Sequence, residues 1–174
     1  MTLSAIHVCP LSKVDEVAMR IDASHLLSLL TVGTEMVRPA SILPQNHLYL
    51  VMHDIAAARD GMTMPGEEHV ANLLGFARRW DRARPLLVHC YAGISRSTAS
   101  AYIVAAALAP RRDEHELAQT LRARSPSATP NPRLIAIADR MLDRNGRMIE
   151  AIKAIGRGAD AFEGVPFELS IEGQ

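Results

Sequence analysis

Short apolar runs, each bounded by turn residues, dominate the first half of the chain. Four of them are typical of buried strands: residues 3–8, 25–30, 47–52 and 85–88. Between the last two runs, apolar residues recur at spacings of three and four, which predicts a helix over about 65–81. Pro65 suits the first turn of that helix. A strand, a helix and a second strand in this order predict a right-handed crossover within a parallel sheet.

The pattern of the second half predicts helices only. An alanine-rich stretch over 97–109 predicts a helix that packs closely on the sheet. Asp113 with Glu116 three residues later has the form of a capping box, and Asn131 before Pro132 has the form of a helix start. A last helix is expected to end at Gly156. The fold class is therefore α/β, with a small, mainly parallel sheet of four to five strands flanked by helices on both faces.

The composition fits one domain with a sizeable core. The 174 residues are 48% hydrophobic and 22% charged, which excludes a disordered chain. We expect a single domain over 1–157, followed by an acidic tail over 158–174 that has no basic side chain and lies loosely on a basic surface. Aromatic residues make up only 4%, and 19 basic residues balance 19 acidic ones. This balance disfavours a nucleic-acid partner.

The distribution of apolar residues also bears on localisation. The longest apolar run, residues 99–109, is too short to span a bilayer, and no secretory leader precedes Pro10. We therefore expect a cytoplasmic protein without a membrane partner.

Two cysteines, Cys9 and Cys90, cannot form a disulfide framework. All basic residues except Lys13 and Lys153 are arginines, which suggests a GC-rich bacterial genome.

The segment LLVHCYAGISRSTA, residues 86–99, carries the candidate chemistry. A buried strand leads into Cys90, Gly93 permits an unusual backbone, and Arg96 follows the cysteine by six residues. A loop between a strand and a helix N-terminus turns successive N–H groups inward and so forms an anion cradle. Arg96 can grip two phosphate oxygens with its planar fork. The same donors stabilise a thiolate, which makes Cys90 the candidate nucleophile.

The segment HCYAGISRS matches the His-Cys-x5-Arg-Ser/Thr signature, so the sequence resembles the cysteine-dependent protein tyrosine phosphatases, most closely the small dual-specificity branch. The resemblance is strong over 85–109 and extends from about 47 to 144. It implies a protein tyrosine phosphatase-like fold in which Cys90 attacks phosphorus and Arg96 binds the phosphoryl oxygens. It also implies that Ser97 helps release the thiolate in the second step and that His89 orients the loop. Backbone donation to phosphate is implied for Tyr91, Ala92, Gly93, Ile94 and Ser95.

Cleavage of a phosphate ester also needs a proton donor for the leaving oxygen, and the family supplies an Asp roughly 30 to 40 residues before the cysteine. Asp54 lies just beyond the strand expected at 47–52, whereas Asp60 precedes Gly61 in a common turn pair. The ends of neighbouring parallel strands share one edge of a sheet. Topology therefore favours Asp54 as the general acid, with Asp60 as the alternative.

Several other polar residues have a structural interpretation beside the functional one. Asn131 follows a proline, as does a loop Asn that the small phosphatases place near the active site, yet an N-cap role already suffices for it. His47 and His53 are interpreted as hydrogen-bonded structural residues rather than a metal site. Three basic residues could rim a phosphosubstrate surface, although a solvated helix face is the simpler interpretation: Arg122, Arg124 and Arg133.

The leading hypothesis is hydrolysis of phosphotyrosine monoesters through a cysteinyl-phosphate intermediate, without metal or other cofactor. Its substrate would be a phosphorylated protein or a small phosphomonoester, and dual specificity is left open. Phosphoinositide or inositol-phosphate hydrolysis is an alternative, disfavoured because the loop YAGIS lacks the lysine that lipid-directed relatives commonly place there. A non-catalytic phosphopeptide-binding module is another, although Cys90, Arg96 and Ser97 are all present. The low-molecular-weight phosphatases carry a similar motif near the N-terminus. The motif of this chain begins at residue 89, which disfavours that family.

Overall fold

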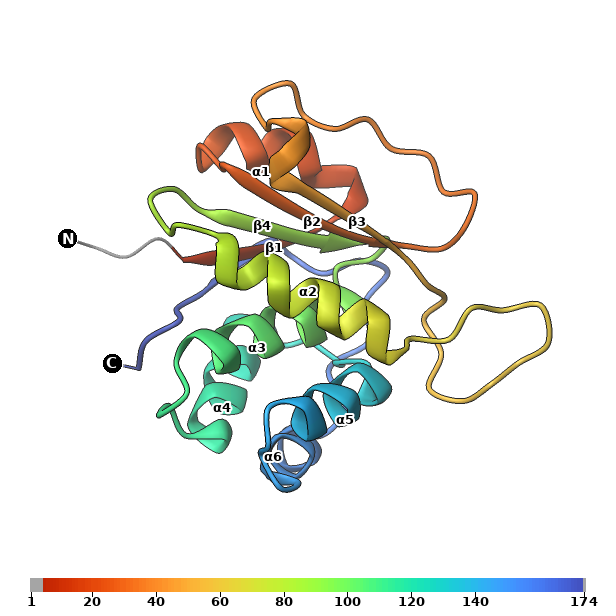
Figure 1. Cartoon of the computed structure of the whole chain (residues 1–174), viewed down its shortest axis with the longest axis vertical. Coiled ribbons are helices and arrows are strands. Elements are labelled where there is room, and N and C mark those ends of the chain that lie inside the picture. Colours follow the sequence, from red (N-terminus) through yellow and green to blue (C-terminus); the bar gives the residue numbers. More distant parts are fainter. Residues whose placement is uncertain (1–4, 174) are drawn as a thin grey trace.

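The computed structural model describes residues 5–173, which are built around a five-stranded sheet in the order β3-β2-β4-β1-β5 (Figure 1). The strands are β1 (Ile6–Pro10), β2 (His25–Leu30), β3 (His47–Val51), β4 (Leu86–Cys90) and β5 (Phe167–Leu169). The first four are parallel, and β5 pairs antiparallel with β1. The inner strands β2 and β4 are almost entirely buried, as both faces of the sheet are covered. The expected α/β class with a mainly parallel sheet is confirmed.

Helices cover the two faces of the sheet unequally (Figure 1). α1 (Val14–Arg20) packs on one face over a small apolar core. The larger core lies on the other side, beneath α2 (Glu67–Arg79), α3 (Arg96–Leu108), α4 (Glu114–Arg124), α5 (Pro132–Met141) and α6 (Arg147–Ile155). Two 3-10 helices, Leu11–Lys13 and Pro44–Asn46, precede α1 and β3.

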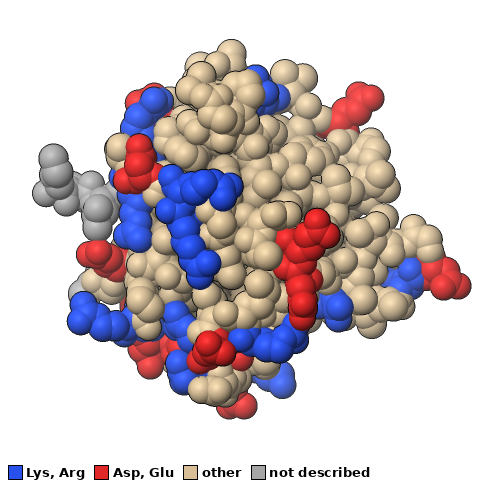
Figure 2. Space-filling view, in the orientation of Figure 1, with Lys and Arg blue, Asp and Glu red and all other residues tan. Residues whose placement is uncertain are grey.

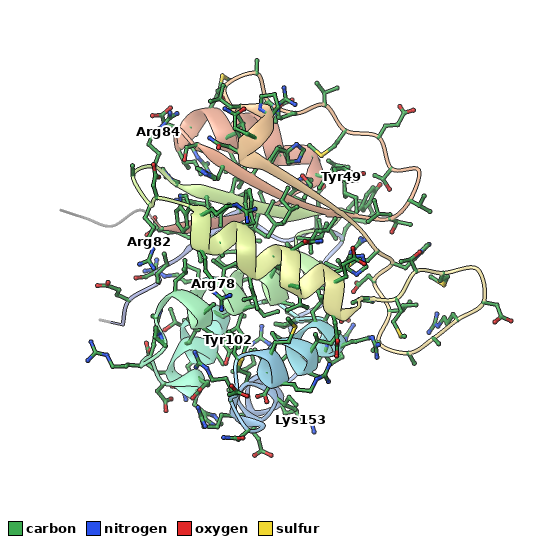
Figure 3. All side chains as sticks on the ribbon, in the orientation of Figure 1. Tyr49, Arg78, Arg82, Arg84, Tyr102 and Lys153 are labelled. Atoms are coloured by element: carbon green, nitrogen blue, oxygen red, sulfur yellow. The ribbon has the colours of Figure 1, made fainter. Side chains whose placement is uncertain are left out.

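The alanine-rich helix α3 packs on the sheet within the larger core, as its sequence predicted. Its residues from Arg96 to Ala106 are all buried, because small side chains let the sheet and the other helices approach closely. Tyr102 points from α3 toward α4 (Figure 3), where its hydroxyl donates to the carbonyl of Glu114 at 2.9 Å. The helix that presents Arg96 and Ser97 is therefore fixed on all sides.

Two elements were missed by the sequence pattern. The helix α1 was not predicted, although Val14, Val17 and Ala18 have helical spacing and are buried. The prediction of helices only after residue 88 is wrong, because β5 adds a fifth strand to the edge of the sheet. The strand expected over 3–8 is β1, which runs from Ile6 to Pro10; residues 3 and 4 lie outside the described residues.

The segment after residue 157 is packed into the fold, contrary to the expectation of a loosely held tail. β5 lies against β1, and Leu169 and Ile171 are buried. The guanidinium of Arg112 donates to the carbonyl of Ile171 at 3.0 Å. In Figure 1 the blue chain after α6 returns to the sheet behind α2 and α3. The domain boundary expected at residue 157 stays a prediction.

The charges that Figure 2 shows are mostly interspersed in sign. Basic side chains gather near the C-terminal end of α2, where Arg78, Arg82 and Arg84 are labelled in Figure 3. This is the end of the helix at which its dipole favours cations. Within residues 5–173, none of the helices combines the length and the apolar character that crossing a bilayer requires.

Candidate active site

Cys90 is the last residue of β4 and lies at the edge of the sheet where the parallel strands end. Residues 91–95 connect it to α3, and the Cys90 side chain is only 2% exposed. Its Sγ lies 3.1 Å from the Oγ of Ser97 in the first turn of α3. A hydroxyl at this distance can donate a hydrogen bond to a thiolate. The sulfur and the hydroxyl are thus within hydrogen-bond distance of each other.

The backbone of the loop is held from outside. Four of its carbonyl groups accept hydrogen bonds from neighbouring segments at 2.8 to 3.2 Å: Tyr91 from Leu11, Ala92 from Gly164, Ile94 from Thr129 and Ser95 from Asn131. Among the described residues, nothing accepts a hydrogen bond from the N–H groups of residues 92–96. Because outward carbonyls leave the N–H groups directed inward, the loop forms a concave set of donors at the N-terminus of α3.

Two glycines let three backbone segments meet at this loop. Gly93 has a φ of +70°, and a Cβ on it would lie 2.8 Å from the backbone nitrogen of Pro10 at the end of β1. Gly164 approaches from the other side, where a Cβ would lie 2.7 Å from the carbonyl oxygen of Gly93. A residue with a side chain at either position would push these segments apart.

One guanidinium nitrogen holds the Arg96 side chain beside the loop. The side chain is buried, and its Nη1 donates to the Thr31 hydroxyl at 3.1 Å and to the Met52 carbonyl at 2.8 Å. The buried Nε has no hydrogen-bond partner within residues 5–173. A buried cationic donor without a partner is costly, and an anion in the adjacent loop would satisfy it.

A buried chain of hydrogen bonds fixes His89 behind the loop. Its Nδ1 lies 3.3 Å from the carbonyl oxygen of Cys90, which can only accept, so we assign the ring proton to Nδ1. The Ser28 hydroxyl then donates to Nε2 of His89 at 2.6 Å, and His47 donates to the Ser28 oxygen at 2.8 Å. Burial lowers the pKa of His89 to about 4, which keeps the ring neutral. The chain orients both the ring and the carbonyl beside the candidate nucleophile.

Asp54, and not Asp60, is brought to the loop. Asp54 follows β3 and is exposed, and its Oδ1 accepts hydrogen bonds from the Ser95 hydroxyl at 2.7 Å and from Nδ2 of Asn131 at 2.9 Å. Asp60 is exposed in the turn before Gly61, and none of its hydrogen bonds to the described residues reaches the loop. Because both bonds to Asp54 end on Oδ1, its Oδ2 is left free.

Asn131 has both of the roles considered for it. Its Oδ1 caps α5 by accepting from the backbone of Arg133 and Leu134 at 3.0 and 3.1 Å. Its Nδ2 donates to Asp54 and to the carbonyl of Ile55. One amide therefore links the start of α5 to the carboxylate beside the loop.

Other polar residues singled out by the sequence are hydrogen-bonded within the fold. The ring of His53 accepts from the backbone of Thr63, and His47 belongs to the chain behind the loop. Arg122 was expected on a solvated face, but it donates to five backbone carbonyls, among them those of Ala128 and Gly156. Arg133 donates to the carbonyl of Pro65 at 2.6 Å, while Arg124 is exposed.

Cys9 differs from Cys90 in its surroundings. It is fully buried in β1, opposite His89 of β4. Burial raises the pKa of the Cys9 thiol to about 12, and negative charge on the neighbouring Cys90 adds to the rise. Cys9 is therefore an unreactive thiol.

Sequence reasoning missed several contributors to this site. It gave Ser95 a backbone role only, whereas the Ser95 hydroxyl holds Asp54. It did not find Ser28 or Thr31, which carry ordinary hydroxyls within and just after an apolar strand. Gly164 contributes a backbone N–H from a segment 70 residues beyond the loop, for which no local signal exists.

Comparisons with solved structures show the fold. The crystal structure of DUSP15 aligns with a TM-score of 0.60 and 17% identity, covering 89% of this chain and 92% of that one. The PTP-2 phosphatase of Cydia pomonella aligns with a TM-score of 0.60 and 15% identity, covering 80% of this chain and 90% of that one. Human DUSP28 aligns with a TM-score of 0.55 and 16% identity, covering 88% of this chain and 97% of that one. No family model matches the chain, and no curated protein matches it in sequence. At these identities the likeness establishes a shared protein tyrosine phosphatase-like fold.

Proposed function

We propose that the protein is a cysteine-dependent phosphatase that hydrolyses phosphotyrosine monoesters through a cysteinyl-phosphate intermediate. One observation carries the proposal. Among residues 5–173, nothing accepts a hydrogen bond from the buried Nε of Arg96 or from the N–H groups of residues 92–96, and this loop directly follows the buried Cys90. A phosphoryl group would satisfy all of these donors at once, with its phosphorus facing the sulfur.

In the first step the Cys90 thiolate attacks phosphorus and the ester P–O bond breaks. The leaving oxygen takes a proton from Asp54, so that a neutral phenol departs. Arg96 and the loop N–H groups balance the charge on the three phosphoryl oxygens as it shifts in the transition state. The outcome is a phosphate bound covalently to sulfur.

In the second step water attacks the cysteinyl phosphate and the P–S bond breaks. Asp54, now a carboxylate, accepts the proton from that water. Ser97 lies 3.1 Å from the sulfur and can donate a hydrogen bond to the departing thiolate. Inorganic phosphate and the free thiolate remain, and the enzyme is ready for another turnover.

The hydrogen bonds on Asp54 support its role as the acid. Ser95 and Asn131 both donate to Oδ1, which favours the proton on Oδ2. The carboxyl group is therefore held in one orientation, with its free oxygen as the donor. Much of the rate enhancement that a general acid supplies comes from holding its proton in the right place in this way.

Phosphotyrosine is the proposed substrate because a phenolate leaves more easily than an alkoxide, so a single carboxylic acid suffices. The loop side chains of residues 91–95 include no lysine that would hold a second phosphate. A phosphoinositide or an inositol phosphate would therefore be bound through one phosphate only.

The test is turnover of a chromogenic aryl phosphate, with a chelator present, by wild type and by Cys90→Ser. We expect turnover by the wild type and none by Cys90→Ser or Arg96→Ala, with Cys9→Ser as the matched cysteine control that keeps its activity. Cys90→Ser should still bind a phosphotyrosine peptide, since the loop donors remain. Turnover by Cys90→Ser at the wild-type rate would refute the mechanism, and binding without any wild-type turnover would instead indicate a phosphopeptide-binding module.

A further inference from the structure

The segment of residues 157–164, which follows α6, forms one wall of the candidate active site; we call it the strap. Backbone hydrogen bonds hold it at three points. Gly158 donates to the Thr129 hydroxyl at 3.1 Å, Ala159 to the Pro126 carbonyl at 2.9 Å, and Gly164 to the Ala92 carbonyl at 2.8 Å. Because backbone groups make these contacts, the strap side chains are free to contact something else.

The strap lines two hollows, one on each side of the loop. The first, of about 250 Å³, contains Asp54 and Ser95 together with Arg157 and Asp160 of the strap. Arg157 and Asp160 form an exposed ion pair at 2.7 Å. Their charges offset each other, so the strap gives this hollow little preference for charge.

The second hollow, of about 170 Å³, lies on the other side of the loop and has the size of a single side chain. Tyr91, the residue after Cys90, and Phe162 of the strap form apolar walls, and both are exposed, at 59% and 87%. Leu11, Ser12 and Ala92 complete the lining beside Glu163, its one charged residue.

Glu163 is half-buried and has no cationic partner. Its Oε2 accepts a hydrogen bond from the Ser12 hydroxyl at 2.6 Å. Within residues 5–173, no Lys, Arg or His side chain lies within ion-pair distance of it. A carboxylate without a counter-charge, so near a loop that would bind a phosphate dianion, repels the phosphate. A substrate that brings its own cation removes this penalty.

We propose that the second hollow selects peptide substrates that carry a lysine or arginine within two residues of the phosphotyrosine. The aliphatic stem of such a side chain would lie between Tyr91 and Phe162, and its charged end would reach Glu163. An extended peptide advances about 3.3 Å per residue, and the strap meets the loop at Ala92, two residues from Cys90. Only the nearest neighbours of the phosphotyrosine can therefore enter the hollow. The proposal rests on the proposed phosphatase function.

The experiment compares kcat/KM for phosphotyrosine peptides that differ at one flanking position, with arginine, norleucine or glutamate there. Glu163→Gln removes the charge but keeps an oxygen that accepts from Ser12. Glu150→Gln, on the exposed face of α6, removes one negative charge elsewhere and is the matched control. An aryl phosphate without any peptide measures basal activity in each variant.

We expect the wild type and Glu150→Gln to prefer the arginine peptide over the norleucine peptide by roughly two- to fivefold, as a partly exposed ion pair allows. Glu163→Gln should lose this preference, while its kcat/KM for the aryl phosphate should not fall and should rise somewhat, because the charge that repels the phosphate is gone. Equal rates for the arginine and norleucine peptides in the wild type would overturn the proposal, and so would a preference that survives in Glu163→Gln. An equal fall for every substrate in Glu163→Gln would also overturn it, because Glu163 would then only fix the strap. Absence of aryl-phosphate turnover in the wild type would instead refute the phosphatase function itself.

Discussion

Gly93→Ala tests the close approach between the loop of residues 91–95 and β1, and Gly61→Ala provides its matched control. Gly93 and Gly61 have nearly the same left-handed backbone, with φ of +70° and +72°. Alanine costs about 1–2 kcal/mol in that conformation at either position. At Gly93 the new Cβ would also lie 2.8 Å from Pro10 N and 2.9 Å from the Cys9 carbonyl carbon, whereas at Gly61 it would meet nothing within 4 Å. Such overpacking typically adds about 1–3 kcal/mol.

The two substitutions change the unfolded chain in the same way, so their difference isolates the contact at the loop. We expect Gly93→Ala to lower the free energy of unfolding by about 2–5 kcal/mol and Gly61→Ala by about 1–2 kcal/mol. Trp80 is the only tryptophan and is 3% exposed, so its fluorescence reports urea unfolding directly. Aryl-phosphate turnover should fall in Gly93→Ala alone, because the loop must move off β1. Equal losses of stability in the two variants would refute the close approach.

Two further predictions concern the acid and the ring behind the loop. Asp54→Asn should lower kcat by about 100-fold for an aryl phosphate with a poor leaving group and much less for a good one, and the same signature in Asp60→Asn instead would show that the other carboxylate is the acid. Burial lowers the pKa of His89 to about 4, whereas an unfolded histidine titrates near 6.5, so the unfolded state binds the extra proton between these values. Stability should therefore fall as pH drops from about 6.5 to about 4, by on the order of 3 kcal/mol from this group. Urea unfolding at several pH values should show a smaller fall in His89→Gln, and an identical pH dependence in wild type and variant would contradict the reasoning.

The residues that could be predicted from the sequence are those whose chemistry is local. Cys90, Arg96 and Ser97 lie within eight residues, at the junction of an apolar strand and a helix, so spacing alone brings them to one loop. The position of Asp54 followed from topology, since β3 and β4 end at the same edge of the sheet. Local pattern and sheet geometry thus sufficed to bring these four side chains together.

What the sequence did not reveal depends on contacts between distant segments. β5 has only three residues, and its pairing with β1 is decided by the packing of Leu169 and Ile171 rather than by a strong local preference. The alternation of Phe167, Leu169 and Ile171 is a strand signal, but the acidic residues around it suggested a tail. The contact of Gly164 with the loop is made by its backbone, which leaves no trace in the residue types.

The loop of residues 91–95 is supported by backbone hydrogen bonds from Leu11 and from Gly164, and this has a consequence for the nascent polypeptide. A growing chain emerges from the ribosome N-terminus first, so the contact from Leu11 to the Tyr91 carbonyl can form as soon as β4 is made. The contact from Gly164 to the Ala92 carbonyl must wait until the helices up to α6 have been synthesised and the chain beyond them has emerged. A partly translated chain therefore carries Cys90 without one of the supports that shape the loop beside it. The last of these backbone supports of the loop forms only after synthesis has passed Gly164.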